Sequence, residues 1–117
     1  MKKKKKLIDK LPKEIVENIL LYRLGLFKNS SFELAEIKNG VDYPQHYHKS
    51  SKAEFYFIMG EGKIILNGKE YPYTKGDIFA VKKGMKHGFK PSKDTLFLSI
   101  QTPPIKNKTS GKEDLHF

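Results

Sequence analysis

Residues 63–71, which read KIILNGKEY, decide the fold class of this chain. Asn67-Gly68 stands between two short segments that favour strands. It is the strongest short-range signal of a β-hairpin, because a type I′ turn needs φ > 0 at both central residues. Gly60 and Gly76 mark further turns on either side of it. The sequence therefore predicts a run of short antiparallel strands around this hairpin.

The hairpin belongs to a longer series of segments that alternate apolar and polar residues or are rich in β-branched and aromatic ones. Many short strands separated by frequent turns are typical of an all-β barrel or sandwich. The predicted strands are 32–37, 43–47, 54–59, 63–66, 69–73, 77–81 and 95–101.

The N-terminal part of the chain carries a different pattern. Residues 1–10 are predicted to form a basic, disordered arm, and a helix is expected over residues 12–23, with Pro12 in its tolerant first turn and Gly25 just beyond its end. This helix is expected to cover the barrel or a dimer interface, or else to offer a surface to a partner. The residues on its predicted apolar face are Ile15, Val16, Ile19, Leu20 and Tyr22.

The composition narrows the class of protein. A length of 117 residues suits one domain, and a hydrophobic content of 38% suits a globular one. Cysteine is absent, which excludes disulfides and thiolate chemistry and agrees with a cytoplasmic location. The basic start MKKKKKLIDK lacks the apolar segment of a signal peptide, and no apolar run is long enough for a membrane span.

The formal net charge of +10 does not predict specific nucleic-acid binding. Arg23 is the only arginine among 23 basic residues, and arginine is the residue that reads base edges and phosphates with two hydrogen bonds. Most of the lysines near the start belong to the predicted arm. We therefore expect a small molecule, rather than a nucleic acid or a membrane, as the binding partner.

Three of the four histidines could meet at one metal ion. His46 and His48 are two residues apart, so that an extended strand would point both imidazoles to the same side. His87 follows after several predicted strands, which gives the chain room to return beside them. Imidazole is the commonest side-chain ligand for transition metals, so this spacing predicts a metal site.

The order of these histidines among glycines resembles the two sequence motifs of the cupin superfamily, in particular its small single-domain members. The first motif runs from Gly40 through His46 and His48 to Gly60, and the second from Gly76 to His87. The resemblance implies a small antiparallel β-barrel of the jelly-roll type, also called a double-stranded β-helix, over about 31–102. It also implies a tail at 103–117, one cupin domain over 11–117 and a homodimer.

Carried over residue by residue, the resemblance implies His46, His48 and His87 as metal ligands. The family's ligand glutamate normally lies seven residues before the glycine that ends its strand, which here is Ala53, and Glu54 comes one residue later. A bulge before Glu54, a strand that ends at Gly62 instead, or a site of three histidines would each account for the offset. We expect Glu54 to be the fourth ligand.

Such a site predicts a metal-dependent enzyme that acts on a small polar molecule, sugar-like or a carboxylate, as an isomerase, an epimerase or a dioxygenase. The alternative is a non-catalytic small-ligand-binding cupin in which the metal has a structural or recognition role, since one fold hosts many functions. Nitrogen and oxygen ligands suit Fe, Mn, Ni, Zn and Cu. The sequence identifies no catalytic base, and His116 is expected to be a tail residue without a role.

Overall fold

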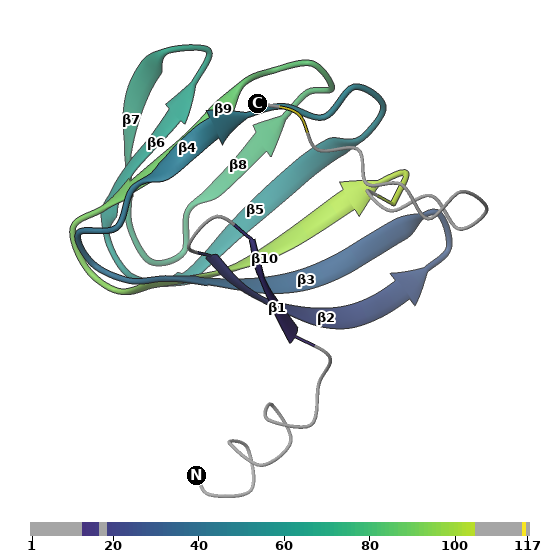
Figure 1. Cartoon of the computed structure of the whole chain (residues 1–117), viewed down its shortest axis with the longest axis horizontal. Helices are drawn as coiled ribbons and strands as arrows, with labels where there is room; N and C mark the ends of the chain where they lie inside the picture. Colours follow the sequence, from purple (N-terminus) through teal and green to yellow (C-terminus); the bar gives the residue numbers. More distant parts are fainter. Residues whose placement is uncertain (1–12, 17–18, 105–115, 117) are drawn as a thin grey trace, which may run out of the picture.

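The computed structural model describes residues 13–16, 19–104 and 116 (Figure 1). The predicted arm at 1–10 and most of the predicted tail at 103–117 lie outside these residues. The described part is all-β, as predicted, and consists of two antiparallel sheets that face each other. None of its elements is a helix that could cross a membrane.

The larger sheet, called sheet A here, has the strand order β1-β2-β3-β10-β5-β8, and the smaller sheet B has the order β4-β9-β6-β7. In Figure 1 the strands of sheet B lie at the upper left, and those of sheet A follow from β8 to β2 towards the lower right. The strands are β1 Lys13–Val16, β2 Ile19–Phe27, β3 Ser30–Ile37, β4 Tyr43–His46, β5 Lys52–Met59, β6 Gly62–Leu66, β7 Lys69–Tyr73, β8 Ile78–Val81, β9 His87–Pro91 and β10 Thr95–Thr102.

The prediction of an N-terminal helix over 12–23 is wrong for the residues that the structure describes. β1 and β2 pair as an antiparallel hairpin, and β2 continues the sheet by pairing with β3. Aliphatic and β-branched residues in this segment also suit a strand, and pairing with a neighbouring strand overrides a weak helical preference. Gly25, expected to stop a helix, lies at an irregularity of the β2–β3 pairing with a φ of 129°.

The central hairpin forms as predicted. β6 and β7 pair from Gly62↔Tyr73 to Leu66↔Lys69, with Asn67 and Gly68 between them at φ values of 48° and 83°. Gly62 has a second role, because an added Cβ would meet the carbonyl oxygen of Lys90 at 2.5 Å. Strands β6 and β9 can therefore approach closely only with glycine at this position.

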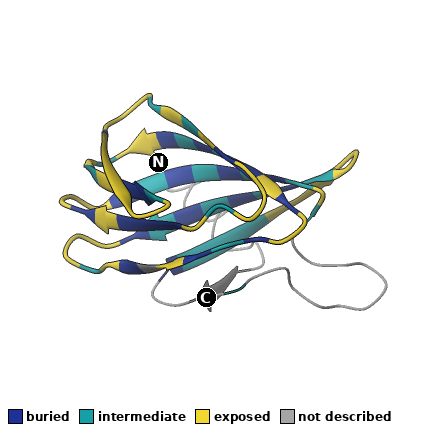
Figure 2. Cartoon of the chain, turned by 90° about the horizontal axis from the view of Figure 1, so that it is seen from above, coloured by how far each residue is buried: buried dark blue, intermediate teal, exposed yellow. Residues whose placement is uncertain are grey.

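The core lies between the two sheets, and burial alternates along β3 and β10 as one face turns inward (Figure 2). Its centre is a cluster of phenylalanine rings with centroids 4.8–6.4 Å apart, and each buried ring contributes about 1.5–3 kcal/mol relative to exposure. Towards one end of the barrel the inward residues of sheet A become polar. The cluster is Phe55, Phe57, Phe89 and Phe97, and the polar inward residues are Ser31, Glu33, Ser99 and Gln101.

Candidate metal centre

The structure brings His46, His48 and His87 together between the sheets. His46 and His87 are directly paired residues of the neighbouring strands β4 and β9, with ring centroids 4.1 Å apart. His48 follows two residues after His46, and its ring lies 5.2 Å from that of His46 and 5.1 Å from that of His87. All three side chains are buried.

The backbone around His48 explains why two histidines point inward from one short segment. His46 and His48 lie on one side, and Tyr47 between them is half-buried on the other, as the two-residue spacing predicts. The amide of Gly84 donates to the carbonyl oxygen of His48 over 2.6 Å. The loop before β9 therefore holds the segment that carries two of the imidazoles.

The electrostatics of the cluster favour a neutral imidazole at His87. Burial lowers the pKa of His87 well below its ordinary value of 6.5, and the neighbouring His46 and His48 lower it further. The Nδ1 atom of His87 lies 3.3 Å from the carbonyl oxygen of Met85, which suits an Nδ1–H donor. That tautomer leaves Nε2 with the lone pair that a metal requires.

The three histidines fit a metal ion in donor type and in spacing. Zinc lies about 2.0–2.1 Å from an imidazole nitrogen, so two such ligand atoms on one ion are at most about 4.2 Å apart. The candidate ligand atoms of the three residues lie within 4.8 Å of one another. A small inward rotation of the rings therefore brings them to ligating distance.

Glu54 is not brought to this cluster. It lies on β5 between Ala53 and Phe55, which are buried inward, and its own side chain is only half-buried on the opposite face. The hydroxyl of Tyr56 donates to its carboxylate over 3.0 Å, and this contact raises the pKa of Tyr56. The pairing of β5 with β10 is regular from Lys52 to Phe57, so no bulge in that part of the strand turns Glu54 inward.

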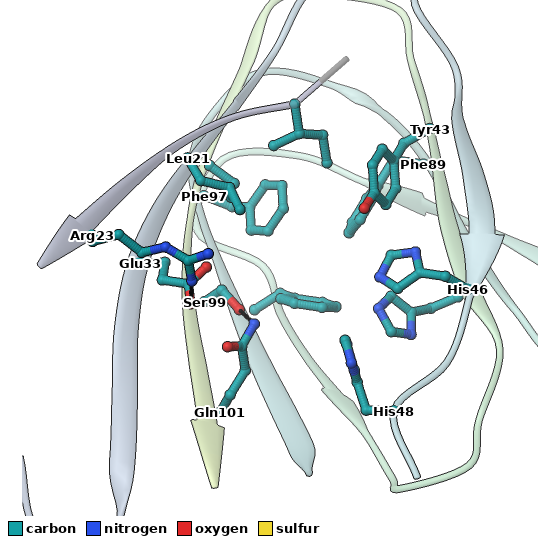
Figure 3. Close-up of a pocket in the computed structure, with 14 residues that line it drawn as sticks. Leu21, Arg23, Glu33, Tyr43, His46, His48, Phe89, Phe97, Ser99 and Gln101 are labelled. Atoms are coloured by element: carbon teal, nitrogen blue, oxygen red, sulfur yellow. Dashed lines mark hydrogen bonds and ion pairs between the residues drawn. The ribbon is translucent and has the colours of Figure 1, made fainter. Parts of the chain in front are cut away.

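A cavity opens beside the histidines and encloses about 530 Å³ of empty space, its mouth included. Its opposite wall comes from β2, β3 and β10 of sheet A and carries a group of polar side chains beside apolar ones (Figure 3). There the guanidinium of Arg23 pairs with the carboxylate of Glu33 over 2.5 Å, and the Glu33 side chain is only 3% exposed. Ser99 and Gln101 line the same wall.

Sequence patterns do not reveal these wall residues. The expected helix over 12–23 places Arg23 at its end, whereas the structure places it on β2 facing the cavity. Glu33 carries no signal of a role, because both faces of the strand expected at 32–37 carry a glutamate and the alternation alone does not show which one turns inward. The buried Glu33 and the half-buried Glu36 differ in burial, which only the second sheet determines.

The expectation that His116 has no role also needs correction. Its backbone pairs with that of Tyr47, with the Tyr47 amide 2.7 Å from the His116 oxygen and the His116 amide 3.0 Å from the Tyr47 oxygen. The two rings stack with centroids 5.2 Å apart. His116 therefore holds Tyr47, the residue between the first two histidines, through its backbone and its ring.

Comparison with known sequences gives two matches that bear on this site. The profile of the cupin domain family matches residues 33–100, a segment that includes all three histidines. The L-ectoine synthase of Saccharophagus degradans is 30% identical over 80 residues, which cover 67% of this chain and 60% of that protein. The chain thus spans about 60% of the length of that curated relative.

Solved structures share the fold at low sequence identity. Pac13 from Streptomyces, described as a unique nucleoside dehydratase and also solved with uridine, superimposes with a TM-score of 0.77 at 16% identity, over 94% of this chain and 87% of that one. An RmlC-like cupin from Shewanella frigidimarina has a TM-score of 0.73 at 19% identity, over 81% and 86% of the two chains. These likenesses show the architecture.

Proposed function

This chain belongs to the cupin domain family, and from that premise we propose that it is a metal-dependent enzyme acting on a small polar molecule in the cavity beside the histidines. The observation that carries the proposal is the convergence of His46, His48 and His87, all buried, on the wall of that cavity. Buried imidazoles without a carboxylate among them are the donor set of a transition-metal site.

The proposed ligand set is the three histidines. A divalent metal there would act as a Lewis acid towards a hydroxyl or carbonyl oxygen of the substrate. Fe, Mn, Ni, Zn and Cu all suit three imidazoles. Glu54 does not belong to the proposed set, because its half-buried carboxylate lies on the outer face of β5 and accepts from Tyr56.

Two features support catalysis over simple binding. The buried carboxylate of Glu33 lines the same cavity as the histidines, and a general base must lie in the pocket from which it takes a proton. Relatives of this fold also carry the names of enzymes, L-ectoine synthase and a nucleoside dehydratase. We therefore favour chemistry that moves a proton, which covers isomerisation, epimerisation and elimination of water, over dioxygenase cleavage.

In this proposal the chain's own residues perform distinct tasks. Glu33 takes a proton from a carbon of the substrate and gives it back to a neighbouring carbon or to a departing hydroxyl, which leaves as water, and Arg23 holds the carboxylate in place. Phe55 and Phe97 line the space between the two polar walls and keep water from the reacting atoms. The polar substrate is held at both ends of the cavity.

Metal analysis tests the site. We expect freshly purified protein to carry close to one transition metal per chain by mass spectrometry, and we expect His46→Ala and His87→Ala to abolish it. Glu54→Gln is the matched control and should keep the metal. Metal retained by both histidine variants, or lost in the Glu54 variant, would contradict the three-histidine site.

Turnover tests the reaction class. Metal-loaded protein is incubated with aldoses and ketoses in D2O under argon and then under air, and the sugars are followed by proton NMR. Deuterium incorporation or a new sugar without oxygen uptake is the expected result. Oxygen consumption would favour the dioxygenase, and ligand binding by calorimetry with no turnover in any metal form would favour the non-catalytic alternative.

The homodimer and the cytoplasmic location remain predictions. One observation supports the homodimer. The outward side chains of sheet A are largely apolar and half-buried, including Leu34 of β3 and Leu98 and Ile100 of β10. The outward face of sheet B instead carries ion pairs, with Glu70 contacting Lys63 and Lys90. A second copy of the chain would cover the apolar face.

A further inference from the structure

The cavity has two chemically different walls. On one side the imidazoles of His46 and His48 point towards it, and on the other lie Arg23, Glu33, Ser99 and Gln101 (Figure 3). Phe55 connects them, with its ring centroid 5.4 Å from that of His87 and 5.2 Å from that of Phe97. A ligand that fills this space contacts the histidines at one end and the Arg23–Glu33 wall at the other.

The charge of the far wall is balanced. The guanidinium of Arg23 and the carboxylate of Glu33 are in direct contact and carry opposite unit charges, so their sum is zero. With a side chain 3% exposed, Glu33 is screened little by solvent. Arg23 alone would attract a carboxylate and Glu33 alone an ammonium group, but each charge is offset by the other, so neither charged end gains a net attraction to repay its desolvation at this wall.

The hydrogen-bonding groups of the wall point to the same ligand chemistry. The hydroxyl of Ser31 donates to Gln101, whose amide nitrogen in turn donates to the hydroxyl of Ser99 over 2.9 Å. Because Ser99 accepts in this chain of contacts, its hydroxyl proton is the group that it can offer to a ligand. The wall thus combines donors from Arg23 and Ser99 with an acceptor from Glu33.

A ligand end that donates and accepts at adjacent atoms, and that carries no charge, matches such a wall. Vicinal hydroxyl groups have these properties, since each hydroxyl is one donor and two acceptor positions. The phenylalanines between the walls suit the C–H face of a sugar ring, and a largely apolar lining with a few placed polar groups is usual for small-molecule pockets.

We propose that the Arg23–Glu33 wall is a recognition site for the neutral polyhydroxy end of a sugar-type ligand, and that it rejects carboxylate- and ammonium-bearing analogues. This inference rests on the proposed function and narrows its substrate class, which was either sugar-like or a carboxylate. The charge balance of Arg23 and Glu33 decides between neutral and charged ligands. The histidine end of the cavity adds affinity for the ligand but does not distinguish neutral from charged ones.

The test measures ligand binding to wild-type protein by calorimetry and by saturation-transfer NMR. The probes are matched pyranoses: glucose, galactose, mannose and xylose as neutral sugars, glucuronate and galacturonate as anions, and glucosamine and galactosamine as cations. We expect at least one neutral sugar to bind about tenfold or more tightly than its charged partners, because one misplaced charge in a desolvated site costs at least that much.

Charge-altering variants give the decisive result. Glu33→Gln leaves Arg23 uncompensated and should shift the preference to the uronates, whereas Arg23→Gln leaves Glu33 uncompensated and should shift it to the amino sugars. The double variant Arg23→Gln/Glu33→Gln restores neutrality and should again prefer the neutral sugar. It also tests the inference if a single variant fails to fold, because removing both members of a buried pair is often tolerated. Glu54→Gln, the same substitution on the outer face, should change nothing.

Parallel measurements on metal-free and metal-loaded protein separate the two proposals. Loss of the expected metal with the charge-dependent preference intact contradicts the proposed function alone. Three outcomes overturn this inference even if the metal binds as expected: the wild type prefers a charged sugar, no probe binds, or the variants keep the wild-type preference. Each would leave the pair as a structural contact of β2 and β3.

Discussion

His46 and His87 are paired residues of adjacent strands whose rings approach to 4.1 Å between centroids with neither imidazole exposed. Adjacent antiparallel strands place the Cβ atoms of directly opposed residues about 4.5–5.5 Å apart, so the pairing register alone brings these rings together. Burial and the neighbouring imidazoles hold the pKa of His87 well below its ordinary value, which favours its neutral form. The fold thus sets the geometry of the candidate metal centre and the charge state of His87.

This arrangement predicts how the stability of the metal-free protein depends on pH. The pKa of His87 is well below 6.5 in the folded state and near 6.5 when unfolded, so between these values the unfolded chain binds the extra proton. Stability should therefore fall as pH is lowered below about 6.5, by up to about 1.4 kcal/mol per pH unit for one proton.

Denaturant unfolding at pH 5 to 8 in the presence of EDTA measures this dependence. His87→Asn removes the titrating ring and should flatten the dependence of stability on pH. A variant whose stability falls as steeply with decreasing pH as the wild type would show that His87 does not resist protonation in the folded state.

The parts of the fold and of the candidate site differ in how far the sequence alone predicts them. The Asn67-Gly68 turn and the strands near it were predicted from local chemistry, because the φ values that this turn requires are a property of the residues themselves. The histidine cluster was predicted from spacing together with resemblance to a family. Its closure depends on the return of β9 beside β4, which no local pattern specifies.

The features that the sequence did not predict depend on pairing between strands that are distant in the sequence. Residues 19–23 read equally well as a helix face or as alternating strand faces, and the pairing of β2 with β3 decides between them. The orientation of Glu54 was uncertain by one residue of register, and the regular pairing of β5 with β10 turns it outward. Glu33 and Arg23 became recognisable as cavity residues only once those registers were known.

Gly62 links the packing of the sheet to the position of His87. A Cβ at residue 62 would lie 2.5 Å from the carbonyl oxygen of Lys90 and 2.7 Å from Cα of Pro91, both in the strand that begins at His87. We expect Gly62→Ala to push β6 and β9 apart, at a cost of about 1–3 kcal/mol in unfolding free energy.

The same substitution should weaken metal binding through the displacement of His87. Thermal unfolding and metal titration check the two effects, and Lys63→Ala, at an exposed neighbouring position, is the control. A Gly62→Ala protein with wild-type stability would show that the two strands separate without cost.

The pairing of His116 with Tyr47 predicts a role for the end of the chain. Deleting residues 116–117 removes two backbone hydrogen bonds, each of which contributes about 1 kcal/mol. We expect faster hydrogen exchange at the Tyr47 amide and severalfold weaker metal binding, since Tyr47 lies between two of the proposed ligands.

His116→Ala separates backbone from ring. It retains both backbone hydrogen bonds and loses the stacking of the two rings, so it should keep most of the protection at the Tyr47 amide. If the alanine variant exchanges as fast as the deletion, the ring contact and not the backbone pairing holds the segment.

The outer face of sheet A gives the last prediction. Its outward residues include Phe32, Leu34, Leu98 and Ile100, an apolar surface across two central strands that are themselves hydrogen-bonded neighbours. Contiguous apolar surface of this kind marks an interface more often than a solvated face.

Leu98→Lys would place an uncompensated charge at the centre of a dimer through this face and should produce monomers in analytical ultracentrifugation. Thr74→Lys adds the same charge at an exposed loop position and should leave the mass of two chains unchanged. A monomeric wild type, or a Leu98→Lys protein that stays dimeric, would remove sheet A from consideration as the interface.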